Sequence, residues 1–243
     1  MQKDSIYITI DVDWACDEVL GHTIDFLEEN EMKATFFVTH DTPLLNRLRE
    51  SSLFELGIHP NFQYLLNGTS EFHNMEEVLE HILEIVPEAV SVRCHSLVQS
   101  SPLLDLFQSK GLKYDVNLFI PWESGIELRP IRHWNGMLRV PYCWEDDGAC
   151  ISGNWITKDQ LSELKGLKVI NFHPIHLYLN TERLERYEIA RAYLSNPKRL
   201  KQMAFTGTQK SAFSELQEVI SYIHVCGGRV QPKCIKEIEG DIA

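Results

Sequence analysis

Short apolar runs alternate with amphipathic segments along most of the chain, and this alternation limits the fold more than any other feature. The runs are almost continuous in β-branched and aromatic residues, which is typical of strands covered on both faces. The segments between them repeat apolar residues at helical spacing. Such alternation predicts a parallel sheet with helices packed outside it. The predicted strands are 7–10, 33–40, 53–60, 89–93, 113–118 and 167–172, and the predicted helices are 17–31, 76–86, 157–164, 181–194 and one within 207–225, with two more beginning at Pro43 and at Ser101.

One region breaks the pattern. Residues 121–154 contain short apolar pieces, three tryptophans and many turn residues, so an irregular β-rich insertion is predicted there. The length of 243 residues suits one large α/β domain, and residues 1–243 are predicted to form it. The pattern does not distinguish an open sheet from a barrel. No glycine-rich loop follows the first strand, which argues against a dinucleotide or P-loop fold.

Composition excludes several classes of function. The net charge of −12 argues against nucleic acid or an anionic membrane surface as a partner. No apolar run approaches membrane-spanning length, so no membrane insertion is expected. The polar N-terminus resembles no secretory signal, and the six cysteines form no CxxC pair. We therefore expect a cytoplasmic protein with reduced thiols, and a homo-oligomer stays open.

Polar side chains follow several of the predicted strands at the point where each strand ends. The carboxyl ends of parallel strands meet at one edge of a sheet, where α/β proteins place their ligands and catalytic groups. A shared site is therefore predicted. The alternative is a set of unrelated helix caps and structural histidines. The residues concerned are Asp11 and Asp13 after the first strand, His40 after the second, His59 after the third, Arg93 and His95 after the fourth, and His173 and His176 after 167–172.

These residue types suit metal-assisted hydrolysis of an amide or ester. Carboxylate and imidazole ligands favour zinc or another borderline divalent metal, and Asp13 with His59 is the best ligand pair. A metal lowers the pKa of its bound water towards ~7, and Asp11 can then act as the base. Arg93 would keep that carboxylate ionised, because a nearby cation lowers a carboxylate pKa. His173 can protonate a leaving amine.

These strand ends resemble the motifs of the polysaccharide deacetylase family, the NodB-homology or carbohydrate esterase 4 group. The resemblance implies a distorted (β/α) barrel with fewer than eight repeats, and removal of N-acetyl or O-acetyl groups from sugars. It also implies that Asp11 is the base and Asp13 a metal ligand. The matching segments are 8–13, 33–38, 55–59, 92–93 and 171–173.

Three further segments resemble the WbmS-like branch of this family, which is linked to O-antigen biosynthesis. They are 57–61, 92–96 and 141–147. The branch implies a nucleotide-linked or lipid-linked sugar made in the cytoplasm as the substrate.

The chain departs from the family at one metal ligand. The family has a second histidine four residues after the first, where this chain has Gln63. We expect His95 to supply the third ligand from the neighbouring strand end, with Asn61 or His176 as alternatives and a weakened or absent metal site as another. Zinc is the expected metal, while nickel, cobalt and iron stay open.

Four residues are predicted to contact the sugar. Trp144 offers an aromatic ring that can stack on a sugar face, and Asp115 lies in or at the end of a predicted strand. Tyr142 and Asp146 lie in the segment that resembles the WbmS-like branch. An alternative for Asp146, or for Asp147, is an ion pair with Arg93.

The predicted function is therefore a metal-dependent deacetylase acting on an acetamido sugar, with Asp11 as base, a metal-bound water as nucleophile and His173 as acid. Two other functions stay open. Asp-x-Asp after a first strand also begins phosphatases of the haloacid-dehalogenase type, in which the first aspartate is a nucleophile. The replacement at Gln63 would also suit a sugar-binding protein without activity.

Overall fold

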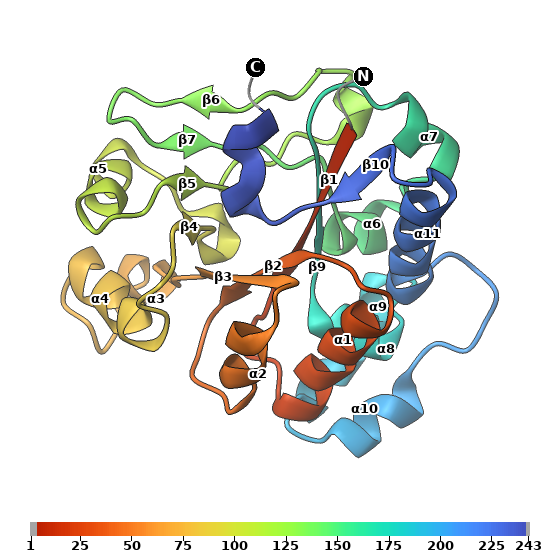
Figure 1. Ribbon diagram of the computed structural model, residues 1–243. Coiled ribbons are helices and arrows are strands. Elements are labelled where there is room, and N and C mark those ends of the chain that lie inside the picture. Colours follow the sequence, from red (N-terminus) through yellow and green to blue (C-terminus); the bar gives the residue numbers. More distant parts are fainter. Residues whose placement is uncertain (1–3, 242–243) are drawn as a thin grey trace.

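The computed structural model describes residues 4–241, and their strands form one continuous, mostly parallel sheet (Figure 1). The strand order is β6-β7-β5-β4-β3-β2-β1-β9-β8, with β10 beside β1, and only β6 and β7 pair antiparallel. The strands are β1 (Asp4–Asp11), β2 (Ala34–Val38), β3 (Phe54–Ile58), β4 (Ser91–Val92), β5 (Tyr114–Asp115), β6 (Ile131–Arg132), β7 (Leu138–Arg139), β8 (Trp144–Glu145), β9 (Lys168–Phe172) and β10 (Val230–Pro232).

The sheet curls into a distorted barrel, and residues 138–145 join its two sides. This segment begins as β7 beside β5, where Val140 N–H donates to Asp115 O at 2.8 Å. It ends as β8 beside β9, where Cys143 N–H donates to Val169 O at 2.9 Å. One stretch of chain is thus hydrogen-bonded to both sides of the curled sheet. The predicted α/β barrel with fewer than eight repeats is confirmed.

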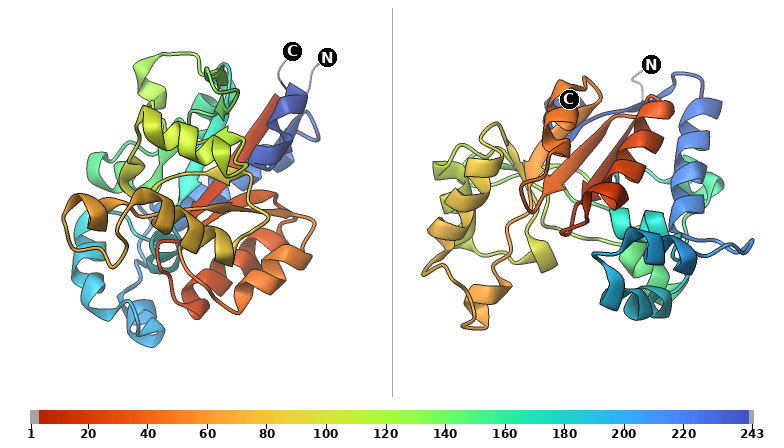
Figure 2. Two further views of the ribbon diagram at one scale, coloured as in Figure 1. Left: turned by 90° about the vertical axis from the view of Figure 1, so that its left-hand side faces the viewer. Right: turned by 90° about the horizontal axis from the view of Figure 1, so that it is seen from below.

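Helices cover the outside of this sheet (Figures 1 and 2). In α1, the buried residues Val19, Leu20, Ile24 and Leu27 recur at helical spacing, which explains why this segment forms a helix against the sheet. Asn74 and Ser100 cap α4 and α5 by accepting backbone N–H groups. The helices are α1 (Asp17–Glu29), α2 (Leu44–Glu50), α3 (Gln63–Leu66), α4 (Met75–Ile85), α5 (Ser101–Ser109), α6 (Asp146–Ser152), α7 (Lys158–Glu163), α8 (Pro174–Leu179), α9 (Leu184–Ala190), α10 (Pro197–Met203) and α11 (Ala212–Val225), with 3₁₀ turns at η1 (His95–Leu97), η2 (Trp122–Ser124), η3 (Arg191–Tyr193) and η4 (Ile235–Asp241).

The insertion differs from its prediction at one end. It contains the short strands β6, β7 and β8, as expected, but residues 146–152 form helix α6. The helix predicted at 181–194 is shorter, because α9 gives way to the 3₁₀ turn η3. Helix α8 was not predicted, because all six of its residues are buried and it shows no alternation of apolar and polar faces.

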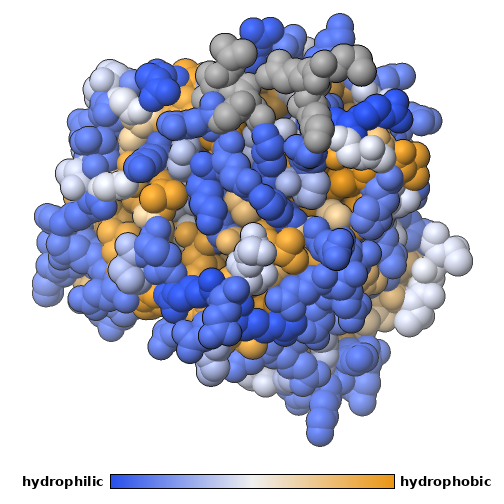
Figure 3. Space-filling model, in the orientation of Figure 1, coloured by the Kyte–Doolittle hydropathy of each residue, from blue (hydrophilic) through white to orange (hydrophobic). Residues whose placement is uncertain are grey.

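The strands explain the continuous apolar runs of the sequence. Ile6, Ile8 and Ile10 on β1 have no exposed surface, and Tyr7 is only 1% exposed, so both faces of the strand are covered. The face in Figure 3 is largely hydrophilic, and its apolar residues lie in separate patches. Within residues 4–241, no helix has both the length and the apolar character needed to span a bilayer.

Candidate active site

The carboxyl ends of four parallel strands bring the predicted site residues to one edge of the sheet. Asp11 is the last residue of β1, and Asp13 lies in the turn after it. His59 directly follows β3 and Arg93 directly follows β4. His173 follows β9, which pairs with β1 on the side opposite β2. The parallel register therefore gathers side chains that are far apart in the sequence.

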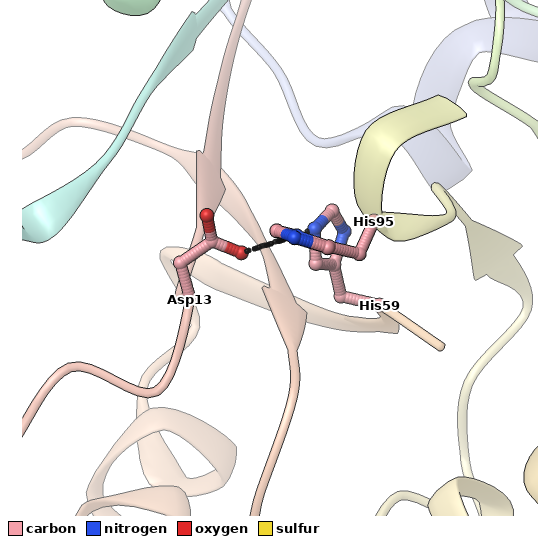
Figure 4. Close-up of side chains that lie close together, drawn as sticks. All are labelled: Asp13, His59 and His95. Atoms are coloured by element: carbon pink, nitrogen blue, oxygen red, sulfur yellow. Dashed lines mark hydrogen bonds and ion pairs between the residues drawn. The ribbon is translucent and has the colours of Figure 1, made fainter. Parts of the chain in front are cut away.

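Asp13, His59 and His95 form a compact group at this edge. One carboxylate oxygen, Asp13 Oδ1, lies 3.2 Å from His59 Nε2 and 3.1 Å from His95 Nδ1. Figure 4 shows the carboxylate of Asp13 pointing toward both imidazole rings. One potential ligand atom from each residue lies within 4.8 Å of the others. The three predicted metal ligands are thus brought together.

The turns that carry Asp13 and His95 have unusual backbone geometry. Asp13 and Trp14 have φ angles of 44° and 53°, and Ser96 and Leu97 have φ angles of 56° and 53°. Residues other than glycine rarely adopt this left-handed region, at a cost of roughly 1–3 kcal/mol each, and such residues cluster at functional sites. The two turns that direct Asp13 and His95 toward each other therefore lower the stability of the fold.

The electrostatics of this group suit a cation. Burial would raise the pKa of Asp13, but hydrogen bonds from His59 and His95 hold it far below its usual range. Burial would also lower the pKa of His95, but its hydrogen bond to Asp13 raises it. His59 Nδ1 is buried and has no hydrogen-bond partner among residues 4–241, and Asp11 Oδ1 is 3.9 Å away. Two imidazoles, one carboxylate and an unsatisfied buried nitrogen fit zinc or another borderline divalent ion.

Asp11 is fixed from both sides. Its Oδ1 accepts a hydrogen bond from Arg93 Nη1 at 2.9 Å, and its Oδ2 accepts one from Asn171 Nδ2 at 3.0 Å. Arg93 is fully buried, and its guanidinium lies between the rings of Phe37 and Tyr142, 4.7 and 4.4 Å from their centroids. These contacts define the orientation of the Asp11 carboxylate.

His173 is anchored by Asp146. Its Nδ1 lies 2.6 Å from Asp146 Oδ1, and its backbone N–H donates to Asp146 Oδ2 at 2.8 Å. The other ring nitrogen, Nε2, faces carboxylate oxygens of Asp11, Asp13 and Asp147 at 3.8, 3.8 and 3.9 Å. Burial would lower the pKa of His173, but the charges of Asp147 and Asp146 raise it well above its usual value. The geometry thus presents Nε2 of His173 to the site.

His176 lies outside the group around Asp13. Its Nε2 is 2.6 Å from Asp147 Oδ1, and its Nδ1 is 3.0 Å from Thr181 Oγ1. Asn61 Oδ1 accepts the backbone N–H of Gln63, the first residue of α3, at 2.9 Å. Neither Asn61 nor His176 belongs to the compact group formed by Asp13, His59 and His95.

The four residues predicted to contact the sugar are buried. Asp115 and Asp146 are fully buried, and Tyr142 and Trp144 are only 1% and 3% exposed. Asp115 pairs with Arg139 at 2.6 Å, Tyr142 donates to Glu145 at 2.8 Å, and the Trp144 N–H donates to Asn154 O at 3.1 Å. Their side chains thus have hydrogen-bond partners within the protein. The alternative ion pair between Arg93 and Asp146 or Asp147 is wrong, because those carboxylates bind His173 and His176.

The sequence analysis missed two residues that support the contact between Arg93 and Asp11. Asn171 binds both Asp11 and Arg93, and Thr9 Oγ1 accepts from Arg93 Nη1 at 3.0 Å and donates to Asn171 at 2.9 Å. Both lie inside otherwise apolar strands and are fully buried. A buried polar side chain in an apolar strand needs a hydrogen-bond partner, so the presence of Thr9 and Asn171 in such strands indicated buried polar contacts.

Comparisons with known proteins identify the family of this chain. The family model for WbmS-like polysaccharide deacetylases matches residues 8–191. A crystal structure from Bordetella bronchiseptica, described as a candidate polysaccharide deacetylase involved in O-antigen biosynthesis, is 45% identical, with 89% of each chain covered and a TM-score of 0.84. The chain therefore belongs to the WbmS-like polysaccharide deacetylase family.

More distant structures share the fold alone. A candidate polysaccharide deacetylase from Mycobacterium smegmatis is 15% identical, with 99% of this chain and 90% of that chain covered and a TM-score of 0.55. The 4-alpha-glucanotransferase from Thermococcus litoralis is 12% identical, with a TM-score of 0.53, and the match covers 100% of this chain and 41% of that one. No curated protein sequence matches this chain.

Proposed function

We propose that the protein is a metal-dependent deacetylase that removes the acetyl group from an acetamido sugar of an O-antigen or related polysaccharide precursor. One observation carries the proposal: a three-residue group of potential metal ligands, an oriented carboxylate and an imidazole flanked by carboxylates meet at one edge of the sheet. His173 Nε2 lies 3.8 Å from both Asp11 Oδ2 and Asp13 Oδ2. The relative from Bordetella bronchiseptica, described as involved in O-antigen biosynthesis, supports the substrate class.

Asp13, His59 and His95 would hold the cation, with zinc preferred to nickel, cobalt or iron for this donor set. A cation there supplies Lewis acidity at the reacting carbonyl. Asp11 accepts the proton of the attacking water, and Arg93 and Asn171 keep its carboxylate oriented for that transfer.

His173 donates a proton from Nε2 to the departing nitrogen, while Asp146 keeps the proton on Nδ1. A proton donor at this position favours an amide substrate over an ester. An amine must be protonated as it leaves, whereas an acetyl ester has a better leaving group. The charges of Asp147 and Asp146 raise the pKa of His173 against the effect of burial, which supports a role as proton donor. We therefore assign N-acetyl rather than O-acetyl groups to this site.

The two other functions have weaker support. A nucleophilic role for Asp11, as in haloacid-dehalogenase-type phosphatases, would leave the grouping of His59 and His95 around Asp13 without a purpose. A sugar-binding protein without activity would not need the anchored pair of His173 and Asp146.

Two variants test the assignment. Asp11→Asn should abolish acetate release from acetamido sugars while the purified protein keeps its metal in elemental analysis. His95→Ala should lose stoichiometric metal. An active Asp11→Asn protein would contradict the base assignment, and full metal content in His95→Ala would show that another residue is the third ligand.

A further inference from the structure

The turn that carries His95 has a backbone that needs support from the rest of the fold. Residues 94–99, called the His95 turn below, follow β4 and contain η1, and Figure 4 shows the His95 side chain projecting from this turn. Ser96 and Leu97 have positive φ angles there. Such a conformation persists only where surrounding contacts hold it. Because His95 belongs to the group of potential metal ligands, the contacts that hold its turn also bear on the metal site.

Asn117, just beyond the end of β5, contacts both ends of the His95 turn. Its Oδ1 accepts the backbone N–H of Cys94 at 2.6 Å, and its backbone oxygen accepts a hydrogen bond from Gln99 Nε2 at 3.2 Å. On the opposite side, His95 N–H donates to Pro60 O at 3.0 Å. Asn117 and Cys94 have no exposed surface, so solvent does not reach the hydrogen bond between them.

The Asn117 side chain takes the place of a backbone contact of the sheet. Val116 N–H donates to Val92 O at 2.9 Å, and a regular parallel ladder would continue with Cys94 N–H donating to Val116 O. Here Val116 O accepts a hydrogen bond from Arg93 Nε at 3.2 Å instead. The buried Cys94 N–H still needs an acceptor, and Asn117 Oδ1 supplies it. The ladder thus ends at Arg93, while the chain stays attached to the sheet at Cys94.

Asp115 orients the amide of Asn117. Its Oδ1 accepts hydrogen bonds from Asn117 Nδ2 at 2.7 Å and from the Asn117 backbone N–H at 3.2 Å. Because the amide nitrogen faces Asp115, the amide oxygen faces Cys94. The second carboxylate oxygen of Asp115 lies 2.6 Å from Arg139 Nε and 3.1 Å from His133 Nε2, and both of these residues belong to the insertion. The buried Asp115 thus links the insertion to the residue that holds the His95 turn.

We propose that Asn117 is a positioning residue of the metal site, which acts through the His95 turn, and that Asp115 fixes the Asn117 amide for this role. The inference rests on the ligand role proposed for His95 and extends it to residues outside the group of potential ligands. Residues that hold a metal ligand in position typically change metal affinity by about 10–100-fold when they are replaced. Loss of the Asn117 amide should therefore weaken metal binding although every ligand is still present.

The experiment uses two metal probes: Zn²⁺ affinity, measured by competition with a chromogenic chelator, and the visible spectrum of the Co²⁺-loaded protein, which reports the geometry of the ligands. The variants are Asn117→Ala, Asn117→Asp, and Asn117→Asp combined with Asp115→Asn. Ser91→Ala is the matched control. Ser91 is equally buried on β4, and its Oγ donates to Glu55 at 2.9 Å rather than to the His95 turn.

Asn117→Ala should weaken Zn²⁺ binding by about 10–100-fold and alter the Co²⁺ spectrum, whereas Ser91→Ala should match the wild type in both. Asn117→Asp should also weaken binding, because two carboxylates then meet. Adding Asp115→Asn should restore part of the affinity, because an amide and a carboxylate again face each other. These variants keep the side-chain volume, so they decide the outcome if Asn117→Ala does not fold. Wild-type affinity in Asn117→Asp, or no recovery in the double variant, would overturn the proposal.

A second pair of variants shows whether the effect passes through His95. In a His95→Ala background, measured at raised Zn²⁺ concentration, Asn117→Ala should cause no further loss of affinity, because the ligand that it positions is already absent. An equal loss in both backgrounds would indicate general destabilisation and overturn the proposal.

Failure of the proposed function has a different result. In that case the wild type releases no acetate, and the metal data, which do not depend on turnover, still decide the inference. If the wild type binds no Zn²⁺, amide hydrogen exchange of residues 94–99 in the metal-free protein decides it. Faster exchange in Asn117→Ala than in Ser91→Ala would support the assignment, and equal exchange in the two would overturn it.

Discussion

Two groups of aspartate and histidine lie side by side in this site, and they differ in how the two residue types meet. Around Asp13, two histidines from different strand ends approach one carboxylate oxygen at 3.2 and 3.1 Å. Around His173, one imidazole is anchored by Asp146 and faces several other carboxylates. The first group has more imidazole than carboxylate, and the second has more carboxylate than imidazole.

Because the ratio of imidazole to carboxylate groups differs, the two groups suit different chemistry. The first group offers two imidazole nitrogens and one carboxylate oxygen as ligands for a cation. An imidazole surrounded by carboxylates keeps its proton, because their negative charges raise its pKa against the effect of burial. The two groups touch through Asp13, whose Oδ1 faces the histidines of the first and whose Oδ2 lies 3.8 Å from His173 Nε2.

The largest expected effect comes from breaking the first group. His59→Ala should lose bound metal and reduce acetate release by roughly a thousandfold or more, because Lewis-acid catalysis is worth several kcal/mol. The measurements are elemental analysis and kcat/KM on an acetamido sugar. His224→Ala, at an exposed position on α11, is the matched control and should retain metal and activity. Unchanged metal content in His59→Ala would remove this residue from the ligand set.

Breaking the second group should leave the first intact. His173→Ala should keep its metal and lose activity by about 10²–10⁴-fold, the usual contribution of a general acid. The loss should be much smaller with 4-nitrophenyl acetate, whose leaving group departs without protonation. Equal losses on the amide and the activated ester would show that His173 does not act as the acid.

A smaller change sharpens the contrast by altering charge within the second group. Asp146→Asn removes one of the carboxylates that raise the pKa of His173, so that pKa should fall. His173 must be protonated to act as an acid, so the alkaline limb of the pH–rate profile should move to lower pH. Activity at neutral pH should fall by about ten- to a hundredfold, as expected for loss of a hydrogen bond to a charged group. An unmoved alkaline limb would contradict the role given to Asp146.

The smallest expected effect concerns a buried acid that has no histidine beside it. Glu215 on α11 is fully buried, its Oε2 lies 3.4 Å from Lys210 Nζ, and burial raises its pKa to about 7. The unfolded chain ionises this group at lower pH, so its contribution to stability is complete below about pH 4.5 and is lost as pH rises through 7. Glu215→Gln should therefore stabilise the protein at pH 8 by about 1–3 kcal/mol and make no difference at pH 4. Thermal unfolding at both pH values measures this, and a destabilised variant at pH 8 would show that the ionised group is favourable.

Much of the fold was predictable because the strands are buried on both faces. Strands β1, β2, β3 and β9 are long apolar runs, and the structure has them where the sequence places them. Parallel strands also gather their carboxyl ends, so Asp11, Asp13 and His59 were expected at one edge. Helices α6 and α8 escaped prediction because short elements have too few residues to show a period.

The supporting contacts of the site were less predictable, because they depend on which side of a strand faces inward. Asp115 and Trp144 resemble ligand-binding residues in the sequence, yet the strand register buries them. Asn171 and Thr9 gave little indication of their contacts, because these connect β9 to β1 across 162 positions of the chain. Spacing along the sequence carries no information about such pairs.

Segment 138–145 connects the two sides of the barrel, and Asp146 directly follows it. Segment 138–145 therefore closes the barrel and also positions the Asp146 carboxylate that binds His173. Local unfolding of segment 138–145 would displace His173 while strands β1 to β4 remained paired. Heat or denaturant should therefore abolish turnover before the core unfolds. The position of His173 depends on segment 138–145, whereas the core depends on the central strands.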